Sequence, residues 1–166
     1  MDSVLPLDVC IRPPGSVLDH ARAAPLPSLG ALTPGLRRIT TLPALLPEWQ
    51  LVQGTRHQHL DAVLAWGHKP SASVAEARAA RDGLPLLRVE DGFLRSVGLG
   101  DQDPPLSIVV DDMGIYYDAS APSRLERLIA QPHASHQLQR AAALRTAWVQ
   151  GRVSKYNHCR NERLAE

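Results

Sequence analysis

Short apolar runs that alternate with an amphipathic segment constrain the fold of this chain more than any other feature. Residues 61–66 and 84–89 are brief apolar runs, as is typical of strands buried on both faces. Between them an alanine-rich segment predicts a helix, which Ser73 and Glu76 would cap at its start and Gly83 would end. This alternation predicts an α/β domain with a mostly parallel sheet.

The segments before this core follow another pattern. Prolines are closely spaced in residues 1–35, too close for a long helix, and predict an irregular arm. Residues 38–46 predict a short helix that ends at Pro47. We therefore expect three parts: the arm at 1–35, an α/β unit at 36–157, and a polar tail at 158–166.

The segments after the core predict a hairpin and two helices. Residues 106–110 and 115–117 are apolar, and the Asp-Asp-Met-Gly turn between them favours antiparallel pairing. Ser123 and Glu126 have the spacing of a capping box. Residues 135–150 predict a last helix, whose inward stripe we expect to comprise Leu138, Ala141, Leu144 or Arg145, and Trp148.

Composition excludes several classes of protein. The net charge of the 166-residue chain is +1, which gives no field for nucleic acid, and no apolar run approaches the roughly 20 residues of a membrane span. Cys10 and Cys159 lie far apart, which argues against a disulfide scaffold or a metal knuckle. We expect a cytoplasmic protein without a bound metal.

Polar residues follow the first predicted strand of the core. Gly67 lets the backbone turn closely, and His68 and Lys69 place a titratable group and a cation at the rim. Ligands of open α/β sheets bind beyond the carboxyl ends of strands, so an anionic sugar or phosphate is one interpretation. A plain strand-to-helix turn with exposed polar residues is the other.

The second strand ends in Glu90-Asp91-Gly92-Phe93-Leu94-Arg95-Ser96. Two adjacent carboxylates near a cation offer an acid or base with a tunable pKa. Glycosyl transfer needs such a group for the proton of the acceptor hydroxyl or for oxocarbenium-like charge. An Asp-Gly turn with a salt bridge to Arg95 explains the same residues.

Other polar groups favour structural roles. Gly98-Leu99-Gly100 lacks the third glycine of a dinucleotide fingerprint and predicts a flexible loop. Turn chemistry is a better interpretation than a metal cluster for the aspartates at 111, 112 and 118. The paired histidines at 57 and 59 lack further ligands nearby for zinc.

Longer motifs resemble a known family. The blocks are residues 66–72, 90–100, 105–112, 114–119, 122–126 and 154–157, and they look like the opening module of the capsule polysaccharide biosynthesis and export family. The resemblance covers roughly residues 36–157. It implies the amino-terminal, acceptor-side Rossmann-like half of a retaining β-Kdo glycosyltransferase of the GT-B type.

The resemblance also implies a donor, an acceptor and roles for six residues. The donor would be CMP-Kdo, with no other cofactor, and the acceptor a lysophosphatidylglycerol-type glycolipid, near the capsule export machinery at the inner membrane. Glu90 and Asp91 would be catalytic. The substrate-binding residues would be His68, Lys69, Arg95 and Ser96.

The end of the chain departs from the family pattern. Residues 158–166 do not resemble the family's continuation into the nucleotide-binding half, so we expect an incomplete module that is inactive alone and self-associates. The alternative function is a non-catalytic binding or assembly module in capsule biosynthesis.

Overall fold

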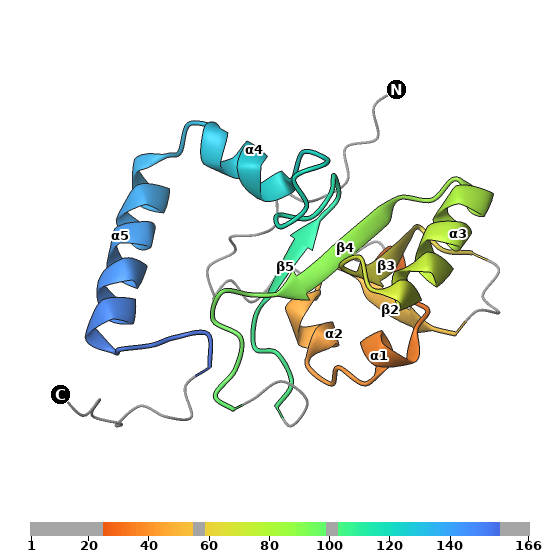
Figure 1. Ribbon diagram of the computed structural model, residues 1–166, viewed down its shortest axis with the longest axis horizontal. Coiled ribbons are helices and arrows are strands. Elements are labelled where there is room, and N and C mark those ends of the chain that lie inside the picture. Colours follow the sequence, from red (N-terminus) through yellow and green to blue (C-terminus); the bar gives the residue numbers. More distant parts are fainter. Residues whose placement is uncertain (1–24, 55–58, 99–102, 157–166) are drawn as a thin grey trace.

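A mostly parallel five-stranded sheet forms the centre of the protein in its computed structural model, which describes residues 25–54, 59–98 and 103–156 (Figure 1). The spatial order of the strands is β2-β1-β3-β4-β5. The first four strands run parallel, and β5 runs antiparallel to β4. The strands are β1 (Ser28–Ala31), β2 (Gln50–Gln53), β3 (Ala62–Trp66), β4 (Leu86–Asp91) and β5 (Ile108–Asp111). The predicted α/β class and mostly parallel sheet are confirmed.

Helices cover both faces of the sheet. One apolar cluster joins β1, β3 and β4 to α1 (Pro34–Arg37) and α2 (Leu42–Leu45). A second cluster on the other face joins β3 and Leu32, which follows β1, to the 3₁₀ turn η2 (Pro70–Ala72) and to α3 (Ser73–Asp82). Four successive residues of β3 are buried, as expected for a strand covered on both sides.

The first strand lies inside the predicted irregular arm, so that interpretation was wrong for residues 28–35. Prolines flank β1 at positions 27 and 34 but do not interrupt it, and the carbonyl of Pro27 accepts a hydrogen bond from Gln50. Pairing on both edges and burial of Leu29 and Ala31 outweigh the irregular flanks. Residues 1–24 of the arm and residues 158–166 of the tail lie outside the described residues.

Two other local predictions near the amino-terminal half were also wrong. The single helix expected at 38–46 is replaced by α1 and α2, because Pro43 has no N–H and fits only the first turn of a helix. Ser73 does not cap α3: η2 already begins the helical path, and the Ser73 hydroxyl donates to the carbonyl of Pro70. Gly83 ends α3 at a φ of 64°, as predicted.

The expected hairpin after β5 does not form. β5 pairs with β4, and the chain turns away because Asp111 Oδ1 accepts hydrogen bonds from the N–H groups of Met113 and Gly114, each 2.8 Å long. Asp111 Oδ2 accepts another from the N–H of Arg124, the first residue of α4 (Arg124–Ala130). The predicted turn chemistry of this aspartate is therefore confirmed.

The two last helices extend away from the sheet (Figure 1). The capping box of Ser123 and Glu126 at the start of α4 is confirmed. The boundaries of α5 (Ser135–Gln150) also match the prediction, but its stripe does not face inward. No residue of α5 is buried within the described structure, and Leu138 and Leu144 are more than half exposed. None of the described helices combines the length and apolarity needed to span a membrane.

Candidate functional site at the carboxyl edge of the sheet

The carboxyl ends of β3 and β4 meet at one edge of the sheet, where four segments of the chain converge. They are the turn after β3, the loop after β4, the turn at Tyr117 and Asp118, and the returning segment at Lys155. In open α/β sheets this edge is where ligands bind. The geometry therefore places the family-like motifs where a site is expected.

The turn after β3 is clamped from two sides. Gly67 adopts a φ of 46°, and an added Cβ would lie 2.2 Å from Tyr117 Oη. The Arg88 guanidinium donates to the Gly67 carbonyl at 2.7 Å, while the N–H of His68 donates to Tyr117 Oη at 3.0 Å. Only glycine fits this close approach, so the turn has one defined shape.

His68 forms a polar pair with Asp118. The His68 Nε2 and Asp118 Oδ2 atoms are 3.1 Å apart, and the Tyr117 ring lies edge-on to the imidazole. The Ser120 hydroxyl, then its N–H, lowers the pKa of Asp118, and the His68 charge adds to that effect. Asp118 is therefore an ionised partner that orients the imidazole at the rim.

The two carboxylates at the end of β4 have separate partners. Glu90 Oε1 accepts hydrogen bonds from Trp66 Nε1 and from the N–H of Asp91, both 3.1 Å long. Asp91 Oδ1 accepts from Arg95 Nε at 2.9 Å. Glu90 thus holds an indole ring, and Asp91 holds a guanidinium.

Arg95 is buried and organises the loop after β4. Its Nη1 atom donates to Ser96 Oγ and to the carbonyl of Asp103, each at 2.8 Å. The Asp103 carboxylate in turn accepts from the N–H of Gly98 at 2.6 Å. The salt bridge expected in the plainer interpretation of this motif is present, as part of a larger network.

The segment around Lys155 returns to this loop across a long stretch of sequence. The Lys155 carbonyl accepts from the N–H groups of Arg95 and Ser96, and Tyr156 forms a parallel bridge with Ser96. Two blocks that carry the resemblance are therefore neighbours in space.

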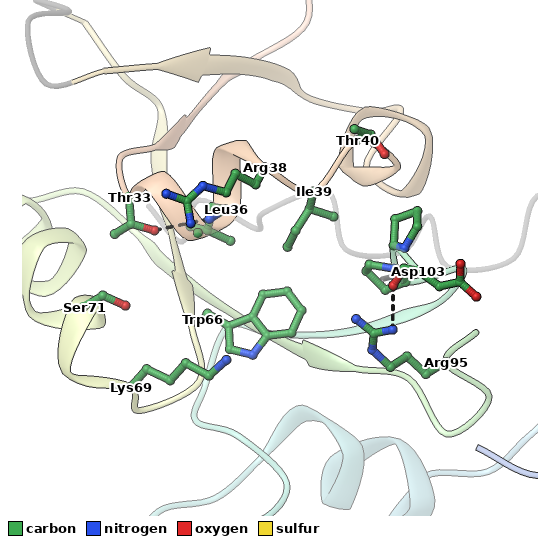
Figure 2. A pocket seen from close by; sticks show the side chains of 13 residues that line it. Thr33, Leu36, Arg38, Ile39, Thr40, Trp66, Lys69, Ser71, Arg95 and Asp103 are labelled. Carbon is green, nitrogen blue, oxygen red and sulfur yellow. Dashed lines mark hydrogen bonds between the residues drawn. The ribbon is translucent and has the colours of Figure 1, made fainter. Parts of the chain in front are cut away.

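A pocket of about 620 Å³ opens beside this network (Figure 2). Its walls come from the segments after β1, β3 and β4. The lining residues are Thr33, Gly35, Leu36, Arg38, Ile39, Thr40, Trp66, Lys69, Ser71, Arg95, Asp103, Pro104 and Pro105. Thr41 Oγ1 donates to the carbonyl of Pro105 at 2.6 Å and joins two of these walls.

The structure divides the six candidate residues into two groups. Lys69 and Arg95 line the pocket. The other four, namely His68, Glu90, Asp91 and Ser96, lie at the same edge but outside the lining. Within the described residues no three His, Cys, Asp or Glu side chains gather as metal ligands would.

Arg38 and Trp66 were missed as pocket residues by sequence reasoning. Trp66 stood in a recognised motif, but its position was interpreted only as a strand end. Arg38 follows β1, and its position next to β3 depends on a strand order that the irregular-looking arm concealed.

The fold and this edge define an α/β domain with polar loops at the carboxyl ends of its strands. Comparison with known sequences identifies its family. The family model described as capsule polysaccharide biosynthesis protein matches residues 61–165, and the chain belongs to this family. The predicted family resemblance is confirmed, but the expectation that the chain departs from the family after residue 157 was wrong, because the match continues to residue 165.

Individual relatives agree with this assignment. The capsule polysaccharide modification proteins LipA of Neisseria meningitidis serogroups B and A are 46% and 45% identical over 127 residues, which is 75% of this chain and 18% of theirs. The lipopolysaccharide-processing protein LpsZ of Rhizobium meliloti is 48% identical over 85 residues, half of this chain and 19% of LpsZ. The chain therefore spans about a fifth of the length of these curated relatives.

Two solved structures are similar in fold. The β-Kdo 2,4 transferase KpsC of Thermosulfurimonas dismutans matches 81% of this chain and 43% of its own, at 36% identity and a TM-score of 0.72. The β-Kdo 2,7 transferase of the same organism matches 84% of this chain and 45% of its own, at 24% identity and a TM-score of 0.50, which bears on the fold alone.

Proposed function

We propose that this chain forms the acceptor-side wall of a retaining β-Kdo glycosyltransferase of the GT-B type. The enzyme would transfer Kdo from CMP-Kdo to a lysophosphatidylglycerol-type glycolipid during synthesis of the capsule linker. Because such an acceptor is anchored in a bilayer, the protein would act at the cytoplasmic face of the inner membrane, next to the capsule export machinery.

One observation carries the proposal: the motif blocks shared with the family converge on the carboxyl edge of the sheet. The Lys155 carbonyl bonds the Arg95–Ser96 backbone, and Tyr117 bonds the turn that carries His68. This is the edge where open α/β sheets bind ligands. The similarity to a β-Kdo 2,4 transferase over 81% of this chain supports the same reaction class.

The candidate residues take defined roles in this proposal. Glu90 or Asp91 accepts the proton of the acceptor hydroxyl or stabilises oxocarbenium-like charge. Lys69 and Arg95 attract anionic groups of the substrate, with Arg95 also fixing the loop that carries Ser96. His68 lies at the rim with its ring oriented by Asp118.

A transfer assay tests the proposal. Residues 25–156, which include β1, would replace the matching segment of the Thermosulfurimonas dismutans 2,4 transferase, and mass spectrometry would measure Kdo added to a β-Kdo-primed lipid from CMP-Kdo. We expect transfer, and a loss of about 100-fold or more in Glu90→Gln or Asp91→Asn. Asp82→Asn, a carboxylate at the end of α3, is the control and should keep full activity.

Each outcome bears on a different part of the proposal. A folded chimera that transfers no Kdo contradicts the function and would favour the non-catalytic binding module. Full activity in both the Glu90 and the Asp91 variant removes the catalytic assignment but leaves the reaction class standing.

A further inference from the structure

The pocket beside the candidate site lies at the topological switch point of the sheet. The chain passes from β1 to β2 on one side and then crosses to β3 on the other side of β1. The loops that follow β1 and β3 therefore diverge, and they leave a crevice between them. Thr33 and Arg38 come from the segment after β1, Trp66 from the end of β3, and Lys69 from the loop after β3.

Two cations of this pocket have no counter-ion among the described residues. Within the part of the chain that the structure describes, neither Arg38 nor Lys69 forms an ion pair, and both side chains are exposed. Arg95 differs, because its guanidinium already forms an ion pair with Asp91. The lining contains three cations and one carboxylate, so the pocket favours an anion.

A fixed aromatic ring lies between these two cations (Figure 2). The Trp66 indole is partly exposed, and its N–H is held by Glu90 at 3.1 Å. Lys69 Nζ lies 5.1 Å from the ring centroid. Because the ring cannot turn freely, it offers a defined apolar face to the C–H groups of a flat or cyclic ligand.

The chemistry around the first loop disfavours a nucleotide phosphate. Pro34 occupies the first turn of α1 and removes one of the N–H groups that a phosphate would use. The helix itself has only four residues. Instead the pocket offers hydroxyl groups from Thr33, Thr40 and Ser71, which suit the hydroxyls of a sugar.

We infer that this pocket binds the carboxylate-bearing ring of an acidic sugar, with the carboxylate between Arg38 and Lys69 and the ring against Trp66. The inference rests on the proposed function, since the acidic sugar would be the Kdo residue at the end of the acceptor. A volume of about 620 Å³ lies within the usual range for small-molecule sites.

Calorimetric titration of the 166-residue chain tests this inference with four probes. The methyl β-glycoside of Kdo should bind, and its methyl ester, which lacks the charge, should bind at least tenfold more weakly. Glycerol 3-phosphate and CMP distinguish a lipid headgroup and a nucleotide from the acidic sugar, and neither should match the glycoside.

Single substitutions locate the site. Arg38→Gln and Lys69→Gln should each weaken glycoside binding about tenfold, because each removes one charge-assisted hydrogen bond. Arg37→Gln is the matched control: Arg37 is adjacent to Arg38 and its side chain is also exposed, but it does not line the pocket. Circular dichroism of each variant checks that the fold is retained.

The inference is overturned if the glycoside does not bind at millimolar concentration, or if the ester, CMP or glycerol phosphate binds as well. Equal affinities in the variants at 37, 38 and 69 also overturn it. These results are separate from those of the transfer assay. A chimera that carries Arg38→Gln and Lys69→Gln and still transfers Kdo normally would remove this subsite and keep the proposed function.

Discussion

The carboxylate of Asp111 holds the end of β5 to the start of α4, and its removal should be among the most destabilising single changes. Asp111 is fully buried and accepts three backbone hydrogen bonds, each 2.8 Å long. Asparagine has nearly the same shape, but only one of its two terminal atoms can accept. The Asp111→Asn variant can therefore keep the bonds to Met113 and Gly114 while its NH₂ group faces the N–H of Arg124.

The cost follows from this geometry. One buried N–H loses its acceptor, which costs about 1–3 kcal/mol, and two hydrogen bonds to a charged group become neutral ones, which costs roughly 1 kcal/mol more. We expect Asp111→Asn to lower the free energy of unfolding by about 3 kcal/mol. Asp111→Ala leaves all three donors without an acceptor and should cost more.

Urea unfolding followed by tryptophan fluorescence, to which the buried Trp49 contributes, measures this change. With a slope of about 2 kcal/mol per molar urea, the midpoint should fall by about 1.5 M. Asp112→Asn is the adjacent control and should cost less than about 1 kcal/mol, since the main partner of Asp112 is the more exposed Arg124, with which it forms an ion pair. A loss below about 0.5 kcal/mol in Asp111→Asn, or equal losses in both variants, would refute this reasoning.

Three further predictions concern other contacts. Gly67→Ala should lower the unfolding temperature more than Gly83→Ala. Both glycines have a positive φ, but only at Gly67 would the added methyl group lie 2.2 Å from another atom, Tyr117 Oη. Thermal unfolding of the two variants measures the difference. The hydrogen bonds of Arg124 lower the pKa of Asp112, so the stability of that pair is present above about pH 4 and is lost as pH falls through the lowered pKa. Arg124→Gln should therefore destabilise at neutral pH, and urea titrations should show the difference narrowing in acid. Leu144→Lys should leave the unfolding midpoint unchanged, because Leu144 is 54% exposed, and should reduce self-association in sedimentation experiments.

Elements with a strong local signal were predictable from the sequence. The apolar run of β3, the end of α3 at Gly83 and the capping box at Ser123 each depend on residues within a few positions of one another. The boundaries of α5 were predictable for the same reason. The direction of its apolar stripe was not, because that depends on what packs against the helix.

Elements that depend on distant partners could not be predicted from the sequence. β1 has four residues among prolines and is stabilised by strands on both sides, which no local pattern reveals. The hairpin after β5 fails because one side chain competes with strand pairing: Asp111 takes the N–H groups of the turn. Without β1 the strand order is unknown, and the switch-point pocket containing Arg38 could not be placed.

The pleat of β4 also separates the roles of its two adjacent carboxylates, Glu90 and Asp91. Neighbouring residues of a strand point to opposite faces, and in the structure Glu90 bonds Trp66 while Asp91 bonds Arg95. The two therefore do not act as one acid–base pair, and their variants should behave differently. Glu90→Gln can keep its bond to the indole through the amide oxygen, so a loss of transfer there would reflect chemistry. Asp91→Asn removes the charge that Asp91 places beside the buried guanidinium of Arg95, so it should lower thermal stability as well as transfer.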